Sequence, residues 1–134
     1  MGIVWNELMT TGVPELDEQH RSLIAALNNL AEAMSAGKGR DEIGKILAFT
    51  GEYAQKHFRA EERYFEKYHC PANAENKREH QRFVNRFTEL MSVFQRTGAD
   101  FKFINSVYKE LSDWLLHHIL GIDITLRPYV QKSA

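Results

Sequence analysis

The sequence has little cysteine or proline, no long apolar run and no excess of charge of either sign. Its single cysteine, Cys70, excludes an internal disulfide and agrees with a reducing compartment. The apolar stretches end within a few residues, which excludes a membrane-spanning helix, and Asn6 and Glu7 interrupt the region that a signal peptide would keep apolar. We therefore expect a soluble, cytoplasmic protein.

The charges of the chain nearly cancel, because 17 Lys and Arg stand against 18 Asp and Glu and leave a net charge of −1. This balance gives no electrostatic reason to bind nucleic acid or an anionic membrane. With 134 residues, 43% of them hydrophobic, the chain has enough apolar material for one core. We expect a single domain over residues 1–134, with neither nucleic acid nor membrane as a partner.

Turn-forming residues divide the chain into four segments, with breaks near Gly37, Pro71 and Gly98. Between the breaks, apolar residues recur at spacings of three and four, which is typical of amphipathic helices. The pattern predicts helices at about 16–36, 41–68, 74–96 and 101–131, after an irregular N-terminal arm at 1–13. Because the connections are short, sequential helices should pack antiparallel. The predicted fold is all-α, an up-down-up-down antiparallel four-helix bundle.

Each predicted helix carries polar side chains on its apolar stripe. In chain order these are His20, then His57 and Glu61, then Asn76 and His80, and finally His118. Antiparallel packing brings the starts of the first and third helices to the same end as the ends of the second and fourth. The polar groups should therefore meet in one buried layer.

A buried layer of imidazoles and carboxylates predicts a metal site. One histidine on a core stripe is more typical of a hydrogen-bonded core residue, but four at one level would leave many lone pairs unpaired, at about 1–3 kcal/mol each. Glu61 lies four residues after His57 and shares its helix face. With no thiolate nearby, imidazole and carboxylate ligands with open positions suit iron or manganese better than structural zinc, and iron is our first choice.

Asp123 has two interpretations. It follows His118 by five residues, which on an ideal helix is about 140° around the axis and not on the same face. Either Asp123 is a solvated surface charge, or a π-type bulge, eased by Gly121, turns it into the layer. His69 and His117 lie off the stripes, so we predict that both remain outside the site.

Several separated motifs agree in order and spacing with one known family. They include Ile3, Val4, Trp5, Gly12–Leu16, Asp17, Gln19, His20, His57, Phe58, Glu61, Glu62, Pro71, Glu79, His80, Trp114, His118 and Asp123. In these residues, which cover nearly the whole chain, the sequence resembles a bacterial hemerythrin.

The resemblance implies a centre of two non-haem iron ions that binds oxygen reversibly. Glu61 and Asp123 would bridge the two irons together with a hydroxide, which favours the bulge interpretation of Asp123. His20 and His57 would hold the iron that has an open position. Trp114 and Leu115, one turn before His118, would form the apolar wall of the oxygen pocket.

The chain departs from the family at Asn76. The family normally has a histidine there, four residues before His80, so that one helix presents two imidazoles to the second iron. An asparagine offers only a weaker carbonyl oxygen, or leaves the place to water. The second iron, held by His80 and His118, would then also have an open position. The alternative is that the substitution has no effect.

The resemblance implies a binding module for oxygen, or for similar small diatomic or anionic ligands, and not an enzyme. The loss of a histidine at Asn76 suits a sensor of oxygen or redox state. The alternatives are a free oxygen carrier or storage protein and a di-iron peroxidase or oxidase; against the enzyme, no titratable group besides the ligands stands near the site. Iron storage would need acidic channels that the pattern does not provide. A signalling output domain, if the protein has one, would lie outside this chain.

Overall fold

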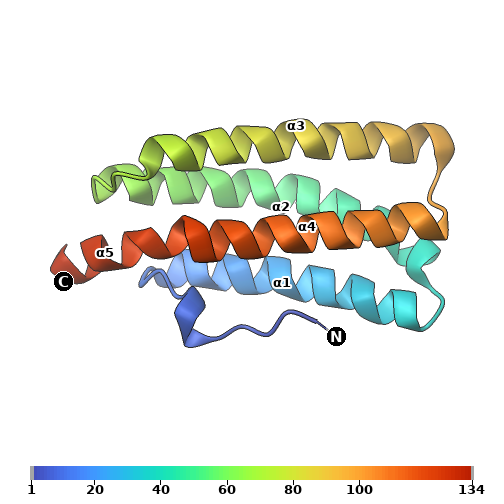
Figure 1. Cartoon of the computed structure of the whole chain (residues 1–134), viewed down its shortest axis with the longest axis horizontal. Coiled ribbons are helices and arrows are strands. Elements are labelled where there is room, and N and C mark those ends of the chain that lie inside the picture. Colours follow the sequence, from blue (N-terminus) through green and yellow to red (C-terminus); the bar gives the residue numbers. More distant parts are fainter. Residues whose placement is uncertain (1, 134) are drawn as a thin grey trace.

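Four long helices, joined by short turns, run alternately up and down in the computed structural model, which describes residues 2–133 (Figure 1). They are α1 (Pro14–Ser35), α2 (Gly39–Lys67), α3 (Asn73–Thr97) and α4 (Phe101–Gly121). A 3-10 helix, η1 (Glu7–Met9), lies in the N-terminal arm, and η2 (Asp123–Leu126) and α5 (Arg127–Ser133) follow α4. The predicted all-α up-down-up-down bundle is confirmed.

The helix ends follow the local chemistry of the sequence. Pro14 opens α1, where its missing N–H costs nothing, and Asp100 caps α4 by accepting a hydrogen bond from the Phe103 N–H at 2.7 Å. Gly98 ends α3 with φ of +74°, a conformation that favours glycine. None of the helices in residues 2–133 is both long and apolar enough to cross a membrane.

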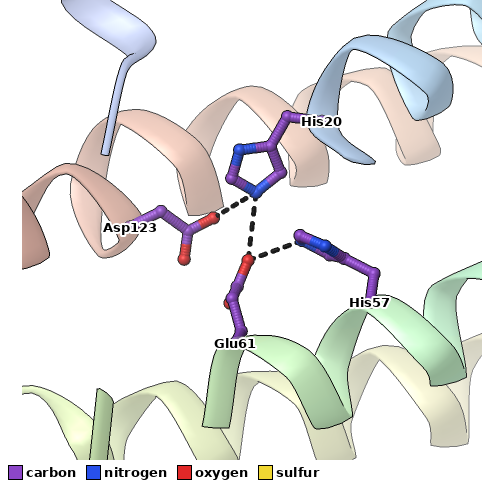
Figure 2. Close-up of side chains that lie close together, drawn as sticks. All are labelled: His20, His57, Glu61 and Asp123. Carbon is purple, nitrogen blue, oxygen red and sulfur yellow. Dashed lines mark hydrogen bonds and ion pairs between the residues drawn. The ribbon is translucent and has the colours of Figure 1, made fainter. Parts of the chain in front are cut away.

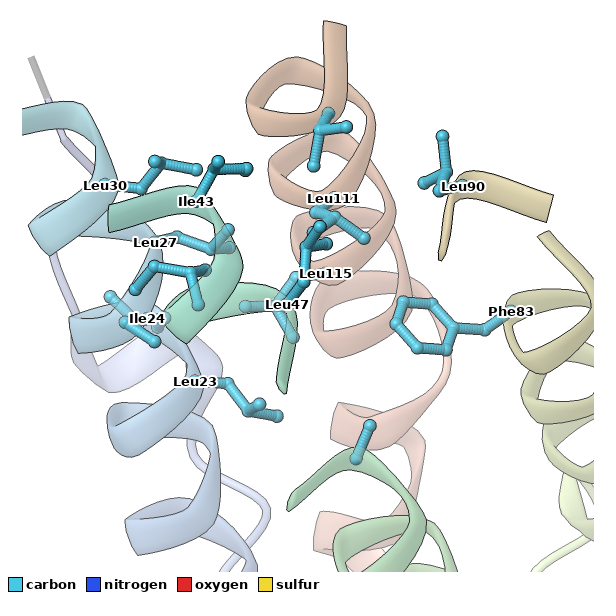
Figure 3. Close-up of a cluster of buried hydrophobic side chains, with 14 of the residues drawn as sticks. Leu23, Ile24, Leu27, Leu30, Ile43, Leu47, Phe83, Leu90, Leu111 and Leu115 are labelled. Carbon is cyan, nitrogen blue, oxygen red and sulfur yellow. The ribbon is translucent and has the colours of Figure 1, made fainter. Parts of the chain in front are cut away.

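An apolar core lies between the four long helices (Figure 3). Leu30 of α1 and Ile43 and Leu47 of α2 are fully buried, and they pack with side chains of α4 and with Phe83 and Leu90 of α3. A second apolar cluster closes the end where α2 turns into α3; its members are Val13, Leu16, Ala60, Phe65, Cys70, Ile122 and Leu126. Polar groups between the two clusters are therefore shielded from solvent.

The prediction of one continuous fourth helix at about 101–131 is wrong. The helix ends at Gly121, and the chain continues through the 3-10 helix η2 before α5 begins. The predicted π-type bulge is also wrong, since no π-helical residue occurs in residues 2–133. The Thr125 hydroxyl donates to the Ile122 carbonyl, and such a bond competes with the helical backbone ladder. The tighter turn rotates Asp123 into the bundle, where it is fully buried.

The N-terminal arm is tied to the bundle by Asp17. This buried carboxylate accepts hydrogen bonds from the Thr10 hydroxyl at 2.6 Å, the Thr11 N–H at 2.8 Å and the Thr11 hydroxyl at 2.9 Å. Arg127 of α5 donates from Nε to the Thr10 carbonyl at 2.8 Å. The arm therefore links the start of α1, through Asp17, to α5, through Arg127.

Replacing Asp17 by alanine should detach the arm. The substitution leaves the Thr11 N–H without its buried acceptor, so we expect the free energy of unfolding to fall by about 1–3 kcal/mol. Denaturant unfolding measures the change, and Glu18→Ala is a matched control because Glu18 is exposed on the same turn. Equal losses in the two variants would contradict this role of Asp17.

Candidate metal centre

Six polar side chains meet inside the bundle, close to the end that the second apolar cluster closes. They are His20 of α1, His57 and Glu61 of α2, His80 of α3, His118 of α4 and Asp123 of η2, and none is more than 4% exposed. The structure therefore brings together six of the seven side chains that the sequence indicates as ligands, and the seventh, Asn76, is buried on the same helix as His80. Two overlapping groups among them have their ligand atoms close enough to hold a metal ion.

Glu61 lies at the centre of the layer and divides its two oxygens between two pairs of histidines. Its Oε2 is 3.0 Å from Nε2 of His20 and 2.6 Å from Nε2 of His57 (Figure 2). Its Oε1 is 2.9 Å from Nε2 of His80 and 3.2 Å from Nε2 of His118. A carboxylate with one oxygen on each side is placed as a bridge between two cations.

Asp123 divides its oxygens in the same way. Its Oδ2 lies 2.9 Å from Nε2 of His20, and its Oδ1 lies 3.1 Å from Nε2 of His118. Two positions result, each with two imidazoles and two carboxylate oxygens. We call the one at His20 and His57 the first position, and the one at His80 and His118 the second position.

Two hydrogen bonds aim the histidines at the layer. Nδ1 of His57 lies 2.6 Å from Oε1 of Gln19, and Nδ1 of His80 lies 2.8 Å from Oε2 of Glu62. When Nδ1 is the donor, the Nε2 lone pair is free for a cation, which is the arrangement that outer hydrogen bonds give to metal-binding histidines. Gln19 and Glu62 carry no predicted role in the sequence pattern, although each directly adjoins a site residue.

Aromatic rings hold two of the imidazoles in place. Phe58 stacks on His80 with ring centroids 3.9 Å apart and an angle of 13° between the planes. Trp114 stacks on His118 at 4.6 Å and 10°. His80 and His118 are the two imidazoles of the second position, so aromatic stacking holds the orientation of both.

The donor set fits a pair of cations better than it fits a hydrogen-bonded core. Nε2 of His57 and both oxygens of Asp123 make no hydrogen bond with any part of the chain that the structure describes, despite their short distances to neighbours. Nε2 of His80 and Nε2 of His118 lie 3.2 Å apart. Unpaired lone pairs converging in a buried site are costly, and bound cations would accept them.

Without a cation, the histidines and carboxylates of the layer shift one another's pKa values. Burial by itself lowers the pKa of His20 and of His118, but the carboxylates of Asp123 and Glu61 outweigh it and raise these pKa values to about 9 and about 10. Burial raises the pKa of Glu61, yet the charge on His57 and contacts from the other imidazoles hold it well below its ordinary value. A metal ion must displace these protons.

Asn76 lies one turn before His80 on α3 and is fully buried. Neither its Oδ1 nor its Nδ2 has a hydrogen-bond partner in residues 2–133. A buried amide with both ends unpaired is unusual, and four residues' spacing places Asn76 on the same face of α3 as His80 of the second position. His69 and His117 are exposed and belong to neither group of potential ligands, as expected.

An apolar cavity of about 30 Å³ reaches the layer from the core side. His57, His118 and Thr50 are the polar residues that line it, and Trp114, Leu115 and Phe58 contribute to its walls. A cavity needs about 10–15 Å³ to hold one water molecule, so this cavity has room for a diatomic molecule. Trp114 and Leu115 thus both line a space beside the layer.

The family described as the Hemerythrin HHE cation binding domain matches residues 11–130. A bacteriohemerythrin of Stenotrophomonas maltophilia is 33% identical over 121 residues, which cover 90% of this chain and 76% of that protein. A bacteriohemerythrin of Pseudomonas aeruginosa is 29% identical over the same shares of each chain. A hemerythrin-like protein of Naegleria gruberi is 29% identical, covering 90% of this chain and 87% of its own.

Solved structures agree with these relatives. The crystal structure of a wild-type hemerythrin superposes with a TM-score of 0.82 at 28% identity, covering 96% of this chain and 97% of that chain. A leucine-to-alanine mutant of hemerythrin gives a TM-score of 0.83 at 27% identity over 97% of this chain and 98% of its own.

The metal-free protein should lose stability as the pH rises above neutrality. Because the folded pKa values of His20 and His118 are raised to about 9 and about 10, their protonation stabilises the fold fully below the ordinary value of 6.5. That stabilisation is lost as the pH rises through the folded values. Denaturant unfolding of chelator-treated protein from about pH 6.5 to about pH 10 checks this, with Glu61→Gln as a flatter reference. An unfolding free energy that rises over this range would contradict it.

Proposed function

Since the chain belongs to the hemerythrin family, which is shown by the match over residues 11–130, we propose that its oxygen-binding centre serves to sense oxygen or redox state. Members of this family bind oxygen at a pair of non-haem iron ions and are not enzymes. What we propose beyond oxygen binding is the sensing role, and the argument for that role depends on Asn76.

The proposed ligands are the six residues of the layer. His20 and His57 would hold one iron, His80 and His118 the other, and the divided carboxylates of Glu61 and Asp123 support a bridging role for both. Bound iron supplies the electrons that reversible oxygen binding requires. Gln19 and Glu62 would orient the imidazoles of His57 and His80 for it.

The apolar cavity supports a neutral diatomic ligand. Trp114, Leu115 and Phe58 give the cavity largely apolar walls, which keep water from the layer. Oxygen enters such a space without losing strong hydration, whereas an ion or a polar substrate would lose it. The walls therefore suit oxygen binding better than the turnover of a polar substrate.

Asn76 is the observation that favours a sensor over a carrier. A carrier must keep its oxygen-bound form from oxidising irreversibly, which is helped by strong ligands on both irons. An amide oxygen or a water at the second position is a weaker ligand than imidazole and leaves that iron more accessible. The oxidised state would then be reached more easily, which suits a signal. A signalling output domain would have to be supplied by a partner outside this chain.

Restoring the imidazole with Asn76→His should slow autoxidation about tenfold or more, because the second iron would gain a third nitrogen ligand. Stopped-flow and slower absorption measurements after mixing reduced protein with oxygen give the rate. Asn85→His, which adds a histidine on the exposed side of the same helix, is the matched control and should leave the rate unchanged. Equal autoxidation rates in all three proteins would rule out the sensor argument.

A further inference from the structure

The two positions of the layer offer a cation the same donor atoms. Each has two imidazole nitrogens and one oxygen from each of the two shared carboxylates. In each position one imidazole, that of His57 or His80, has a hydrogen-bond partner at Nδ1. Nδ1 of the other imidazole, that of His20 or His118, has none in the part of the chain that the structure describes. The positions therefore differ in charge only through what lies behind His57 and His80.

The partners behind these two imidazoles are a neutral amide and a carboxylate. Nδ1 of His57 lies 2.6 Å from Oε1 of Gln19, whereas Nδ1 of His80 lies 2.8 Å from Oε2 of Glu62. Glu62 forms no ion pair with a lysine or arginine in residues 2–133, so no neighbouring cation offsets its charge. Its side chain is 32% exposed, which keeps much of the carboxylate out of water. The second position thus has one more negative charge in direct contact with its ligands.

A carboxylate also stands behind the first position, but at one remove. Gln19 donates from Nε2 to Oε2 of Glu15 at 3.4 Å, and the same carboxylate accepts from the Tyr64 hydroxyl at 2.8 Å and lies 3.7 Å from the Arg63 guanidinium. The Glu15 side chain is 44% exposed. Solvent and the guanidinium therefore screen its charge, and an amide separates it from His57.

The charge of Glu62 favours a more highly charged ion in the second position. A carboxylate that accepts the Nδ1 hydrogen of a metal-binding imidazole makes Nε2 a stronger donor. A stronger donor and a nearby negative charge both stabilise trivalent iron more than divalent iron. The other groups on this side, the rings of Phe58 and Trp114 and the amide of Asn76, are neutral and do not offset the carboxylate.

We propose that Glu62 sets the order in which the two irons are oxidised. The divalent iron between His80 and His118 passes one electron to an external acceptor, such as oxygen, and becomes trivalent before the iron between His20 and His57 does. Glu62 acts through His80 and touches neither iron, so it is a positioning residue. The half-oxidised protein is then one defined species, which suits a module that reports redox state. This inference rests on the proposed function, because it takes both positions to be iron sites.

The hydrogen bond can be tested apart from oxidation in protein loaded with Zn²⁺, which does not change its charge. Glu62→Gln keeps an oxygen acceptor of the same size and removes the charge. The proton NMR signal of His80 Nδ1–H should move upfield, because an amide oxygen is a weaker acceptor than a carboxylate. The signal of His57 Nδ1–H should stay in place. An unmoved His80 signal would overturn the proposal.

The redox test is a potentiometric titration of the iron-loaded protein without oxygen, with chemical mediators and absorption as the readout. Glu62→Gln should raise the potential of the first one-electron step by about 59 mV, which corresponds to a tenfold change, and move the second step less. Glu66→Gln is the matched control, since it removes an exposed carboxylate of α2 that contacts no imidazole. If Glu62→Gln shifts both steps equally, or no more than Glu66→Gln does, the proposal fails.

A second variant works in the opposite direction and does not disturb Glu62. Glu15→Gln combined with Gln19→Glu moves a carboxylate into direct contact with His57 without changing the net charge. The potential of the second one-electron step should fall by about 59 mV, again tenfold, while the first step changes less, so the gap between the steps narrows. A wider or unchanged gap would contradict the role given to the outer carboxylate.

The number of oxidation steps separates this inference from the function on which it rests. Fewer than two irons per chain, or a single one-electron step, would contradict the two-iron centre and the inference with it. Two steps that respond to Glu62→Gln no more than to Glu66→Gln would leave the centre intact and contradict only the order of oxidation.

Discussion

The carboxylate of Glu61 lies fully buried between four imidazole rings, and most of the structure is arranged around that contact. A carboxylate in an apolar interior is unfavourable unless every lone pair has a partner. Here the partners come from all four long helices, so the helices must keep one register for the layer to form. The register of the bundle and the chemistry of the site therefore depend on each other.

The surroundings of the layer follow from the same constraint. Apolar clusters lie on both sides of it, and their low polarity strengthens each electrostatic contact inside. The short 3-10 helix η2 interrupts the last helix at the point where Asp123 has to turn inward. Two cavities of different chemistry reach the layer, an apolar one beside His57 and His118 and an acidic one beside His118 alone.

The sequence pattern predicted the parts of the structure that depend on helical periodicity. The stripes that carry His20, His57, Glu61, His80 and His118 have the spacing of one helix face, and antiparallel packing was enough to bring them to one end. Asp123 could not be placed in this way, because its position depends on a break in the helix that the Thr125 hydroxyl stabilises. Periodicity alone left it undecided, and the predicted bulge had the wrong geometry.

Other features of the site depend on side-chain contacts that no spacing reveals. Gln19 and Glu62 lie at the edges of their helical stripes, and only the packed structure shows that they reach His57 and His80. The substitution at Asn76 was visible in the sequence, but its lack of any hydrogen-bond partner was not. A solvent-facing cavity of about 240 Å³ likewise joins residues of α3 and α4 that are about forty positions apart in the chain.

The central claim is that this layer of histidines and carboxylates holds two iron ions and binds oxygen. The most direct test is to measure iron per chain in the purified protein and to follow the visible spectrum as the reduced, anaerobic protein meets air. The account predicts about two irons per chain and an absorption band that appears only with oxygen and decays as the protein oxidises. Zinc in the site, a single iron per chain, or two irons without an oxygen-dependent band would contradict it.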